Sequence, residues 1–450
     1  MSLLTIVLAA GKGTRMKSAL PKVLHPVGGL SLLGHVLSTV KLASDGQVAI
    51  VIAPDMAAVR TETESRLAGS LVFTQAQQLG TAHAVLAARE AIARHTGDVL
   101  VVFADTPFLS LETLEQLRGA LTERTPLAVL GFEAADPTGY GRLVRDAAGD
   151  LVAIREEKDA SAEERRITFC CSGVMAFRAG VMLGILDQIG HGNAQGEYYL
   201  TDAVAVARSQ GFRVATIACP QDEVLGINSR GQLAEAEAIF QGRARERALA
   251  EGATLIAPET VWFSHDTTIG RDVTIEPNVF FGPGVTVEND VVIRANCHFE
   301  GAHLRRGARV GPFARLRPGA DLGPDVHIGN FVEVKNVKIG AGAKANHLAY
   351  LGDGRVGEGA NIGAGTIFCN YDGYSKHLTD VGTGAFIGSN VSLVAPIRIG
   401  DGAYIGSGSV ITRDVPADAL ALERSPQEVR PGWAAKFRTM MMRRRAARTK

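Results

Sequence analysis

A glycine-rich string near the start of the chain carries the strongest chemical signal of the first half. Leu8-Ala-Ala-Gly-Lys-Gly-Thr-Arg-Met16 follows a short apolar run, and Pro21-Lys22 comes soon after it. A glycine-rich turn exposes backbone N–H groups and a following helix start adds its dipole, so the two together bind phosphate. Arg15 and Lys22 would add positive charge against bound phosphates. A lone Gly-x-Gly is usually only a tight turn, but the complete string is far more specific.

Asp105 is a second candidate, because it stands just past an apolar run that ends at Phe103. Open α/β sheets bind ligands at the carboxyl ends of their parallel strands. A carboxylate in that place is a suitable ligand for Mg²⁺ beside phosphates. For this residue alone, an aspartate in a turn or a helix cap is a competing interpretation.

These side chains need a sheet that brings the ends of several strands together. Three continuous runs rich in β-branched residues fit strands that are buried on both faces of a parallel sheet. They are Thr5–Leu8, Val48–Ile52 and Val99–Phe103. The amphipathic segments His83–Arg94 and Ser110–Glu123 predict helices between the strands, with Ser110 as an N-cap. This alternation predicts a doubly wound, Rossmann-like α/β domain over residues 1–228.

Residues 229–250 are rich in Ala, Glu, Arg and Leu, and they predict a single helix that links this domain to a second one over residues 251–450. In the second domain an apolar side chain recurs every six positions, which is the period of a parallel β-helix. Each short strand would send one such side chain into the core, and stacked coils would bury the column. The positions are Ile269, Ile275, Phe281, Val287, Ile293, Phe299, then Leu304, Val310, Leu316, Leu322, Ile328, Val334, and later Val381, Ile387, Leu393, Ile399, Ile405, Ile411.

The six-residue column is interrupted between Phe368 and Val381. The residues between them, CNYDGYSKHLTD, predict a loop that leaves the coil. Loops of this kind are usually the functional part of a solenoid, because the scaffold needs only its repeat. Residues 424–450 have no repeat and end in a basic sequence, for which a solvated tail is favoured over a nucleic-acid-binding segment.

The overall composition limits the classes of function. Lys plus Arg and Asp plus Glu are 47 each, which argues against a general role at nucleic acids or membrane surfaces. The five cysteines show no Cys-x-x-Cys spacing, as suits a reducing compartment. No signal sequence and no stretch of roughly 20 apolar residues occurs. The chain is therefore expected to be cytoplasmic, with no nucleic-acid or membrane partner.

Over nearly its whole length the chain resembles the bacterial family of bifunctional N-acetylglucosamine-1-phosphate uridylyltransferases/glucosamine-1-phosphate acetyltransferases. Strings that carry the resemblance include Gln75-Ala-Gln-Gln-Leu-Gly-Thr81, Asp136-Pro-Thr-Gly-Tyr-Gly-Arg142, Glu156-Glu-Lys-Asp159, Gln195-Gly-Glu-Tyr-Tyr-Leu-Thr-Asp202 and Gly226-Ile-Asn228. The resemblance implies a left-handed β-helix, a homotrimer and two reactions. Glucosamine-1-phosphate is acetylated by acetyl-CoA, and its product then reacts with UTP, in the presence of Mg²⁺, to give UDP-N-acetylglucosamine and pyrophosphate.

The resemblance also implies roles for residues of the first domain. The sugar-phosphate oxygen would attack the α-phosphorus of UTP in line, with Lys22 and Arg15 stabilising the negative charge, so no protein nucleophile is required. Residues implied in binding UTP or UDP-N-acetylglucosamine are Leu8, Ala9, Ala10, Gly11, Lys22, Gln75, Gly80, Thr81, Asp105, Gly141, Glu156, Cys171 and Asn228. Of these, Gly141 and Glu156 would contact the N-acetylglucosamine, and Asp105 and Asn228 would also bind Mg²⁺.

The chain departs from the family pattern at two places. Phe103-Ala104 stands where the family usually has Tyr-Gly before the metal-binding aspartate. Cys171-Ser172-Gly173 stands where it usually has Asn-Thr-Gly. The asparagine would contact the sugar, and a cysteine is a poorer hydrogen-bond partner. These departures bear on the choice of sugar more than on the type of reaction.

In the second domain, polar side chains gather on consecutive repeats between residues 317 and 371, within strings such as Asn330-Phe-Val-Glu-Val-Lys335 and Lys344-Ala-Asn-His347. Transfer of an acetyl group to an amine needs a base near neutral pH, and His347 is the expected proton acceptor. The residues implied in binding glucosamine-1-phosphate are Arg317, Lys335, Tyr350 and Asn361. Those implied in binding acetyl-CoA are Ala364, Asn370, Tyr371, Ser389, Ser407 and Arg424.

Three alternative interpretations compete with a two-site enzyme. Histidines 298, 303, 327 and 347 could form a metal site, as in hexapeptide-repeat carbonic anhydrases, but nothing pairs them in the needed geometry. The chain could be a nucleotidylyltransferase whose β-helix serves only oligomerisation, which the cluster from Arg317 to Tyr371 disfavours. It could also be a non-enzymatic scaffold, which the glycine-rich turn, Lys22 and Asp105 disfavour.

Overall fold

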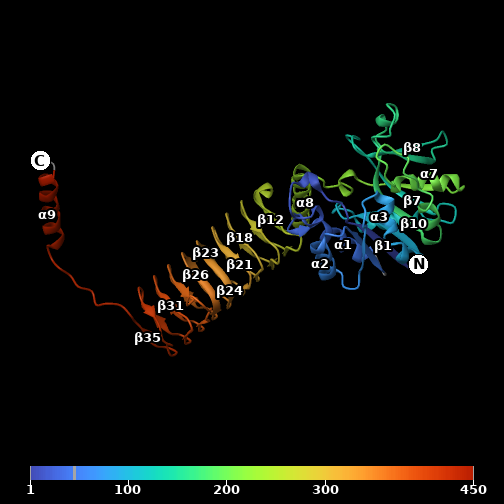
Figure 1. Ribbon diagram of the computed structural model, residues 1–450. Helices are drawn as coiled ribbons and strands as arrows, with labels where there is room; N and C mark the ends of the chain where they lie inside the picture. The colour runs from blue at the N-terminus through green and yellow to red at the C-terminus, as the bar shows by residue number, and fades with distance from the viewer. Residues whose placement is uncertain (1, 44–46, 449–450) are drawn as a thin grey trace. The chain divides into compact units, whose positions relative to one another are not determined.

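The computed structural model describes residues 2–43 and 47–448 and consists of two compact units (Figure 1). The first unit is Met1–Ala244 and the second is Arg245–Lys450. Helix α8 (Arg230–Ala250) runs across the boundary between them. None of the helices in the described ranges combines the length and the apolar character that a membrane span requires.

The first unit is built on a nine-stranded mixed sheet with the order β11-β7-β10-β6-β1-β4-β5, and β8 and β9 are attached beside β10. The three predicted strands are confirmed as neighbouring parallel strands in its centre, where all but one of their residues are buried. The sheet is mixed because β10 runs antiparallel to both β6 and β7. The strands are β1 (Leu3–Leu8), β4 (Val48–Ile52), β5 (Leu71–Thr74), β6 (Asp98–Phe103), β7 (Leu127–Glu133), β8 (Gly141–Arg145), β9 (Leu151–Arg155), β10 (Phe169–Arg178) and β11 (Val214–Ala218), with the small pair β2 (Pro26–Val27) and β3 (Leu30–Ser31) apart.

The helices of this unit follow the predicted segments with two differences. The segment 83–94 is split into α3 (Thr81–Leu86) and α4 (Arg89–Arg94), because Ala87 and Ala88 donate to carbonyls three residues back and tighten the turn. Helix α5 (Leu111–Gly119) begins as predicted, with the Ser110 hydroxyl accepting from the N–H of Thr113, but ends earlier than expected. The other helices are α1 (Leu32–Ala43), α2 (Ala57–Arg66), α6 (Ala179–Leu186) and α7 (Ala203–Ser209), with short 3₁₀ turns η1 (Thr14–Met16), η2 (Lys22–Leu24), η3 (Glu164–Arg166), η4 (Leu200–Asp202) and η5 (Gln221–Glu223).

The second unit is the predicted parallel β-helix, and Figure 1 shows its short strands stacked coil upon coil. Every position of the six-residue column is buried except Ile269, which is half-buried. One ladder joins β12 (Thr254–Leu255), β14 (Thr274–Ile275), β17 (Val292–Ile293), β20 (Arg309–Val310), β23 (His327–Asn330), β25 (Lys344–His347), β27 (Asn361–Ile362), β30 (Phe386–Ile387), β33 (Tyr404–Ile405) and β35 (Leu420–Ala421). The others contain β13 (Thr268–Ile269), β15 (Phe280–Phe281), β16 (Thr286–Val287), β18 (His298–Phe299), β19 (Ala302–Leu304), β21 (Arg315–Arg317), β22 (Ala320–Leu322), β24 (Glu333–Ile339), β26 (Tyr350–Val356), β28 (Ile367–Cys369), β29 (Thr379–Val381), β31 (Ser392–Val394), β32 (Ile397–Ile399) and β34 (Val410–Ile411).

Two segments of this unit lie outside the repeat. The predicted loop leaves the coil after β28 and returns at β29, and its residues 371–376 are exposed. The basic tail contains helix α9 (Trp433–Arg448), whose side chains are exposed throughout. The sequence pattern predicted a solvated tail but not this helix.

Candidate active sites

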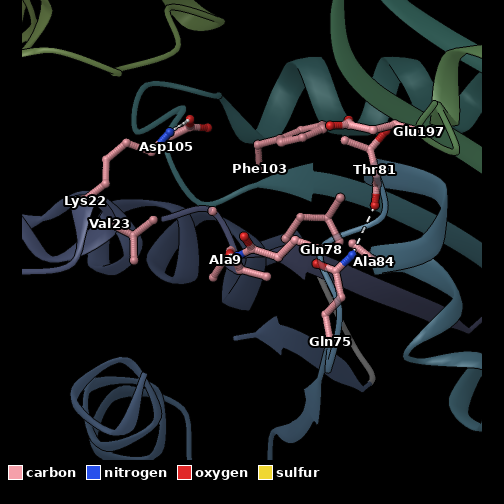
Figure 2. A pocket seen from close by; sticks show the side chains of 14 residues that line it. Ala9, Lys22, Val23, Gln75, Gln78, Thr81, Ala84, Phe103, Asp105 and Glu197 are labelled. Atoms are coloured by element: carbon pink, nitrogen blue, oxygen red, sulfur yellow. Dashed lines mark hydrogen bonds and ion pairs between the residues drawn. The ribbon is translucent and has the colours of Figure 1, made fainter. Parts of the chain in front are cut away.

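A cavity of about 330 Å³ opens at the carboxyl ends of β1 and β6, where the sequence places the glycine-rich string and Asp105 (Figure 2). Its walls contain nine of the residues expected to bind the nucleotide, and five others that were not expected. The expected ones are Leu8, Ala9, Ala10, Gly11, Lys22, Gln75, Gly80, Thr81 and Asp105, and the additional ones are Val23, Gln78, Ala84, Phe103 and Glu197.

The glycine-rich turn differs from the expected phosphate loop because no full helix begins after it. Its successor is the three-residue turn η1, so a helix dipole contributes little here. Gly13 has φ 61°, and a Cβ there would lie 2.5 Å from the Cβ of Lys22, so glycine is what lets the turn pass beside that lysine. Arg15 is exposed and is not among the residues that line the cavity.

Glutamine amides organise the other end of the cavity. The Nε2 of Gln75 donates to the carbonyl of Gly80 at 3.1 Å and lies 3.1 Å from Nδ1 of His83. The Nε2 of Gln78 donates to the carbonyl of Ala10, which fixes the glycine-rich turn to the loop before α3. Gln78 was part of a family-like string, yet no feature of the sequence distinguished its side chain from its neighbours.

Lys22, Asp105 and Asn228 meet at one point, although they lie far apart in the sequence. The Lys22 ammonium pairs with the carboxylate of Asp105 and donates to Oδ1 of Asn228 at 2.9 Å. Figure 2 shows the lysine side chain extended toward Asp105. A cation thus stands between two hard oxygen donors, which are the donors that Mg²⁺ prefers. Asp105 and Asn228 therefore fit a magnesium ion.

A second cavity, of about 180 Å³, shares Thr81 and Phe103 with the first. Gly141, Glu156 and Cys171, which were expected near the sugar, all line it. Both departures from the family pattern, Phe103 and Cys171, therefore fall on its wall. Further lining residues are Gly139, Tyr140, Ser172, Gly173, Met175, Leu200 and Thr201.

The ionisable groups of this second cavity have altered proton affinities. Burial raises the pKa of Glu156; a hydrogen bond from Thr201 opposes this, and the nearby carboxylates of Asp202 and Asp159 add to it. Burial also raises the pKa of Cys171 to about 12. The Cys171 sulfur accepts from the N–H of Gly173 at 3.3 Å, which opposes this shift. Because burial outweighs that hydrogen bond, this wall presents a neutral thiol at neutral pH.

In the second unit, positive side chains stand on consecutive rungs. Strand pairing places Arg317 directly beside Lys335 and Lys335 beside Gly352. Arg317 donates to Glu333 at 2.8 Å. A Cβ on Gly352 would lie 2.5 Å from the hydroxyl of Tyr350 and 2.8 Å from Nδ2 of Asn370, so glycine allows these two side chains to approach.

Asp353 holds the ejected loop against the coil. Its carboxylate accepts from Nδ2 of Asn336 at 2.8 Å and from Nδ2 of Asn370 at 2.5 Å, and the Lys335 ammonium lies 3.5 Å away. Although burial opposes ionisation, these hydrogen bonds and the nearby lysines lower the pKa of Asp353. Asn370 is buried, so its amide anchors the loop, whereas Tyr371 is exposed.

The loop brings a further cation, Lys376, to Lys335. The close contact with Lys335 and the charge of that lysine lower the pKa of Lys376. Two lysines and Arg317 thus concentrate positive charge on one face of the coil, as an anionic ligand would require. Lys376 was not among the residues expected in this site; its place in the interrupting loop was the signal that could have found it.

His347 ends strand β25 and is exposed. Its Nδ1 lies 2.8 Å from Oδ1 of Asn330 on the preceding coil. An amide oxygen only accepts, so Nδ1 carries the hydrogen and Nε2 of the neutral ring keeps its lone pair. A ring in this tautomer can accept a proton at Nε2, and Asn330 is the residue that sequence reasoning missed.

At one corner of the β-helix, hydrogen bonds link successive rungs from His347 toward the tail. The N–H of Gly365 donates to the carbonyl of His347, and the N–H of Asn390 donates to that of Ala364. On the same corner, the N–H of Ser389 donates to Oγ of Ser407 at 3.1 Å, and Arg424 donates to the Ser407 carbonyl at 2.9 Å. Asn361 pairs with Lys344 on the strand that ends at His347. One edge of the coil therefore carries four of the residues expected to bind acetyl-CoA, which are Ala364, Ser389, Ser407 and Arg424.

The other histidines of the metal-site hypothesis have separate surroundings. His298 stacks on Phe280 with ring centroids 4.8 Å apart, and Nε2 of His303 lies 2.8 Å from Glu288. Burial, with the charges of Arg309 and Lys344, lowers the pKa of His327. Within the described part of the chain, no group of three or more His, Cys, Asp or Glu side chains could hold a metal ion.

Comparison with known proteins places both halves in known families. Residues 5–167 match the MobA-like NTP transferase domain, and residues 266–301 and 379–413 match the bacterial transferase hexapeptide (six repeats). These matches confirm the nucleotidyltransferase domain and the left-handed β-helix implied by the resemblance.

Proteins named bifunctional protein GlmU match the chain from end to end. That of Azorhizobium caulinodans is 62% identical over 438 residues, which cover 97% of each chain. That of a Bradyrhizobium species is 57% identical over 442 residues, covering 98% of each. That of Agrobacterium fabrum is 53% identical over 449 residues, covering 100% of this chain and 99% of the relative. The chain therefore belongs to the GlmU family and is a bifunctional enzyme with uridylyltransferase and acetyltransferase activities.

Proposed function

We propose that uridylyl transfer takes place in residues 1–228, across the two cavities that share Thr81 and Phe103. UTP occupies the larger cavity and N-acetylglucosamine-1-phosphate the smaller one. The observation that carries this assignment is the contiguity of the cavities, with Lys22 and Asp105 on the wall of the larger one.

In this reaction the chain positions the substrates and stabilises the negative charge on their phosphates. The backbone of Leu8 to Gly11 and the Gln75 side chain hold the nucleotide, and the Lys22 ammonium stabilises negative charge on the phosphates as pyrophosphate leaves. Asp105 and Asn228 would hold Mg²⁺, which would neutralise charge on phosphate oxygens. Arg15, which is exposed, reaches the triphosphate only if its side chain turns toward the cavity.

Acetyl transfer is assigned to the β-helix of residues 251–450, on the face that carries His347. Nε2 of His347 takes the proton of the glucosamine amine, and Asn330 holds the ring from its other side. Arg317 and Lys335 bind the sugar phosphate, while Tyr350 and Asn361 orient the sugar. Acetyl-CoA follows the corner formed by Ala364, Ser389, Ser407 and Arg424, with Asn370 and Tyr371 of the loop beside it.

An apolar stripe next to His347 supports a homotrimer. Phe313, Phe331 and Leu348 are 49%, 55% and 59% exposed, and the two phenyl rings stack with centroids 5.2 Å apart. All three have positive φ, at 56°, 58° and 52°. Bulky side chains in that conformation are strained. Burial of the stripe against a second copy of the chain compensates for that strain and encloses the acetyl site.

We place the enzyme in the cytoplasm, where its substrates are small molecules and its own copies are its partners. The five free cysteines fit a reducing compartment. The product, UDP-N-acetylglucosamine, is the activated sugar from which cell-wall polymers are made.

A two-readout assay tests these assignments. The enzyme is incubated with glucosamine-1-phosphate, acetyl-CoA, UTP and Mg²⁺, and free thiol and pyrophosphate are followed together. His347→Ala abolishes thiol release and leaves pyrophosphate release from N-acetylglucosamine-1-phosphate nearly intact, whereas Asp105→Asn does the reverse. His303→Ala, on the same β-helix, is the matched control and changes neither. Loss of both activities in a folded His347→Ala variant would show that the two sites are wrongly assigned.

A further inference from the structure

The segment Glu197–Thr201 crosses between the two cavities of the first unit. It is fixed to the nucleotide loop by three hydrogen bonds. The N–H of Tyr198 donates to Leu79 at 2.8 Å, and the carbonyl of Tyr198 accepts from Ala82 at 2.9 Å. The N–H of Leu200 donates to the hydroxyl of Thr81 at 2.9 Å.

Gly80 makes this attachment possible. It has φ 118°, and a Cβ at this position would lie 2.5 Å from the carbonyl oxygen of Tyr198. Only glycine tolerates both that conformation and that proximity. The loop that lines the nucleotide cavity and the segment that lines the sugar cavity are therefore joined directly.

The other end of the segment holds Glu156. The buried hydroxyl of Thr201 donates to Oε1 of Glu156 at 2.9 Å, and both side chains line the smaller cavity. Leu200 and Thr201 are consecutive, so one residue contacts the nucleotide loop and the next contacts the sugar-facing carboxylate. No role was expected for Thr201 from the sequence.

We propose that Thr201 is a positioning residue for uridylyl transfer, which orients Glu156 toward the sugar and couples it, through Leu200 and Thr81, to the nucleotide loop. This inference rests on the assignment of the smaller cavity to the sugar phosphate. Thr201 acts through Glu156 and through the segment, whereas Glu156 itself contacts the sugar.

The hydrogen bond from Thr201 also favours the ionised form of Glu156. Burial and the carboxylates of Asp202 and Asp159 raise the pKa of Glu156, while Thr201 and the charge of Arg142 lower it. A charged carboxylate accepts hydrogen bonds from sugar hydroxyls more strongly than a protonated one does. Without Thr201, Glu156 binds its proton at higher pH, and the sugar is held less well as the pH falls.

The test compares Thr201→Val with Thr201→Ser in the full-length enzyme, with pyrophosphate release as the readout. Thr201→Val raises the KM for N-acetylglucosamine-1-phosphate by about tenfold or more, the usual effect of losing a hydrogen bond to a charged group. The KM for UTP and kcat change by less than about twofold at saturation. The pH below which the sugar-phosphate KM rises also moves upward. Thr201→Ser restores both properties.

Thr113→Val is the matched control, because the Thr113 hydroxyl donates to Glu223 at 2.7 Å away from both cavities. It removes the same kind of contact and leaves the KM and its pH profile unchanged. Coupling is tested with Thr81→Val, whose effect on the sugar-phosphate KM is non-additive with that of Thr201→Val. An unchanged KM in Thr201→Val, or additive effects, would overturn the proposal. A wild-type enzyme that releases no pyrophosphate would instead overturn the proposed function itself.

Discussion

Asn330 offers the sharpest test of the role proposed for His347, because it contacts Nδ1, whereas Nε2 is the ring nitrogen assigned to take the proton. Asn330→Ala removes the 2.8 Å contact with Nδ1. A neutral hydrogen bond contributes about 0.5–1.5 kcal/mol net, so acetyl transfer should fall roughly two- to tenfold. Removal of the base itself should cost far more, on the order of 10²–10⁴-fold. Uridylyl transfer should not change in either variant.

Asn330→Asp should instead change the pH dependence of acetyl transfer. A carboxylate still accepts from Nδ1, and it also stabilises the protonated ring. An exposed ion pair contributes roughly 0.5–1 kcal/mol, which corresponds to about half a pH unit. Only the unprotonated ring can take a proton from the amine, so the rise of acetyl transfer with pH should move upward by that amount. At pH 7 the variant is slower, and at high pH it recovers.

The assay follows the loss of the acetyl-CoA thioester at a series of pH values, with uridylyl transfer measured on the same samples. Glu288→Gln is the control, because Glu288 contacts His303 at 2.8 Å on the same β-helix but outside the site. Its pH profile should match that of the wild type. The assignment of His347 and its orientation by Asn330 would be refuted if Asn330→Ala lost as much activity as His347→Ala. It would also be refuted if Asn330→Asp left the profile in place.

Three other predictions concern the metal, the cysteine wall and the β-helix core. Chelation of divalent cations should stop pyrophosphate release and spare thiol release; loss of both would contradict the placement of Mg²⁺ at Asp105 and Asn228. Burial raises the pKa of Cys171 to about 12, so alkylation at pH 8, followed by peptide mass spectrometry, should be much slower in the native enzyme than in urea; equal rates would show an open thiol. Phe299 is fully buried, in register between Phe281 and Leu316. Phe299→Ala should lower the free energy of unfolding of the second unit by about 3–5 kcal/mol, as seen by urea denaturation, while uridylyl transfer persists; unchanged stability would contradict the packing.

The buried framework could be predicted because its positions repeat the same environment. Each inward position of the β-helix meets the same kind of core, so the six-residue period identifies it directly. The central strands of the sheet, such as Val48–Ile52, are likewise buried on both faces. The break at Ala87 and Ala88 and helix α9 could not be predicted in this way. The break depends on local hydrogen bonds, and helix α9 buries no apolar face that a sequence pattern could reveal.

The residues that position the chemistry were harder to identify, because they act from neighbouring coils. Asn330 is 17 residues from His347, and Asp353 is 17 residues from both Asn336 and Asn370. That separation is close to the length of one coil, which is three hexapeptides. A search for polar residues about one coil length apart in the sequence would therefore have found these pairs. No regular spacing in the sequence relates Thr201 to Glu156, because the tertiary fold of the α/β unit brings them together.

The stacked coils also determine where residues can be inserted or deleted without disturbing the acetyl-transfer site. The residues assigned to acetyl transfer occupy consecutive coils from Arg317 to Arg424, and coils before β21 carry none of them. An extra complete coil inserted before β21 would extend the solenoid without altering any distance within the site. The same insertion between Lys335 and His347 would shift their partners by one rung, roughly 4.8 Å. Whole coils can therefore be inserted or deleted before β21 without changing the acetyl-transfer site. Insertions or deletions between Arg317 and Arg424 would displace the residues of the site relative to one another.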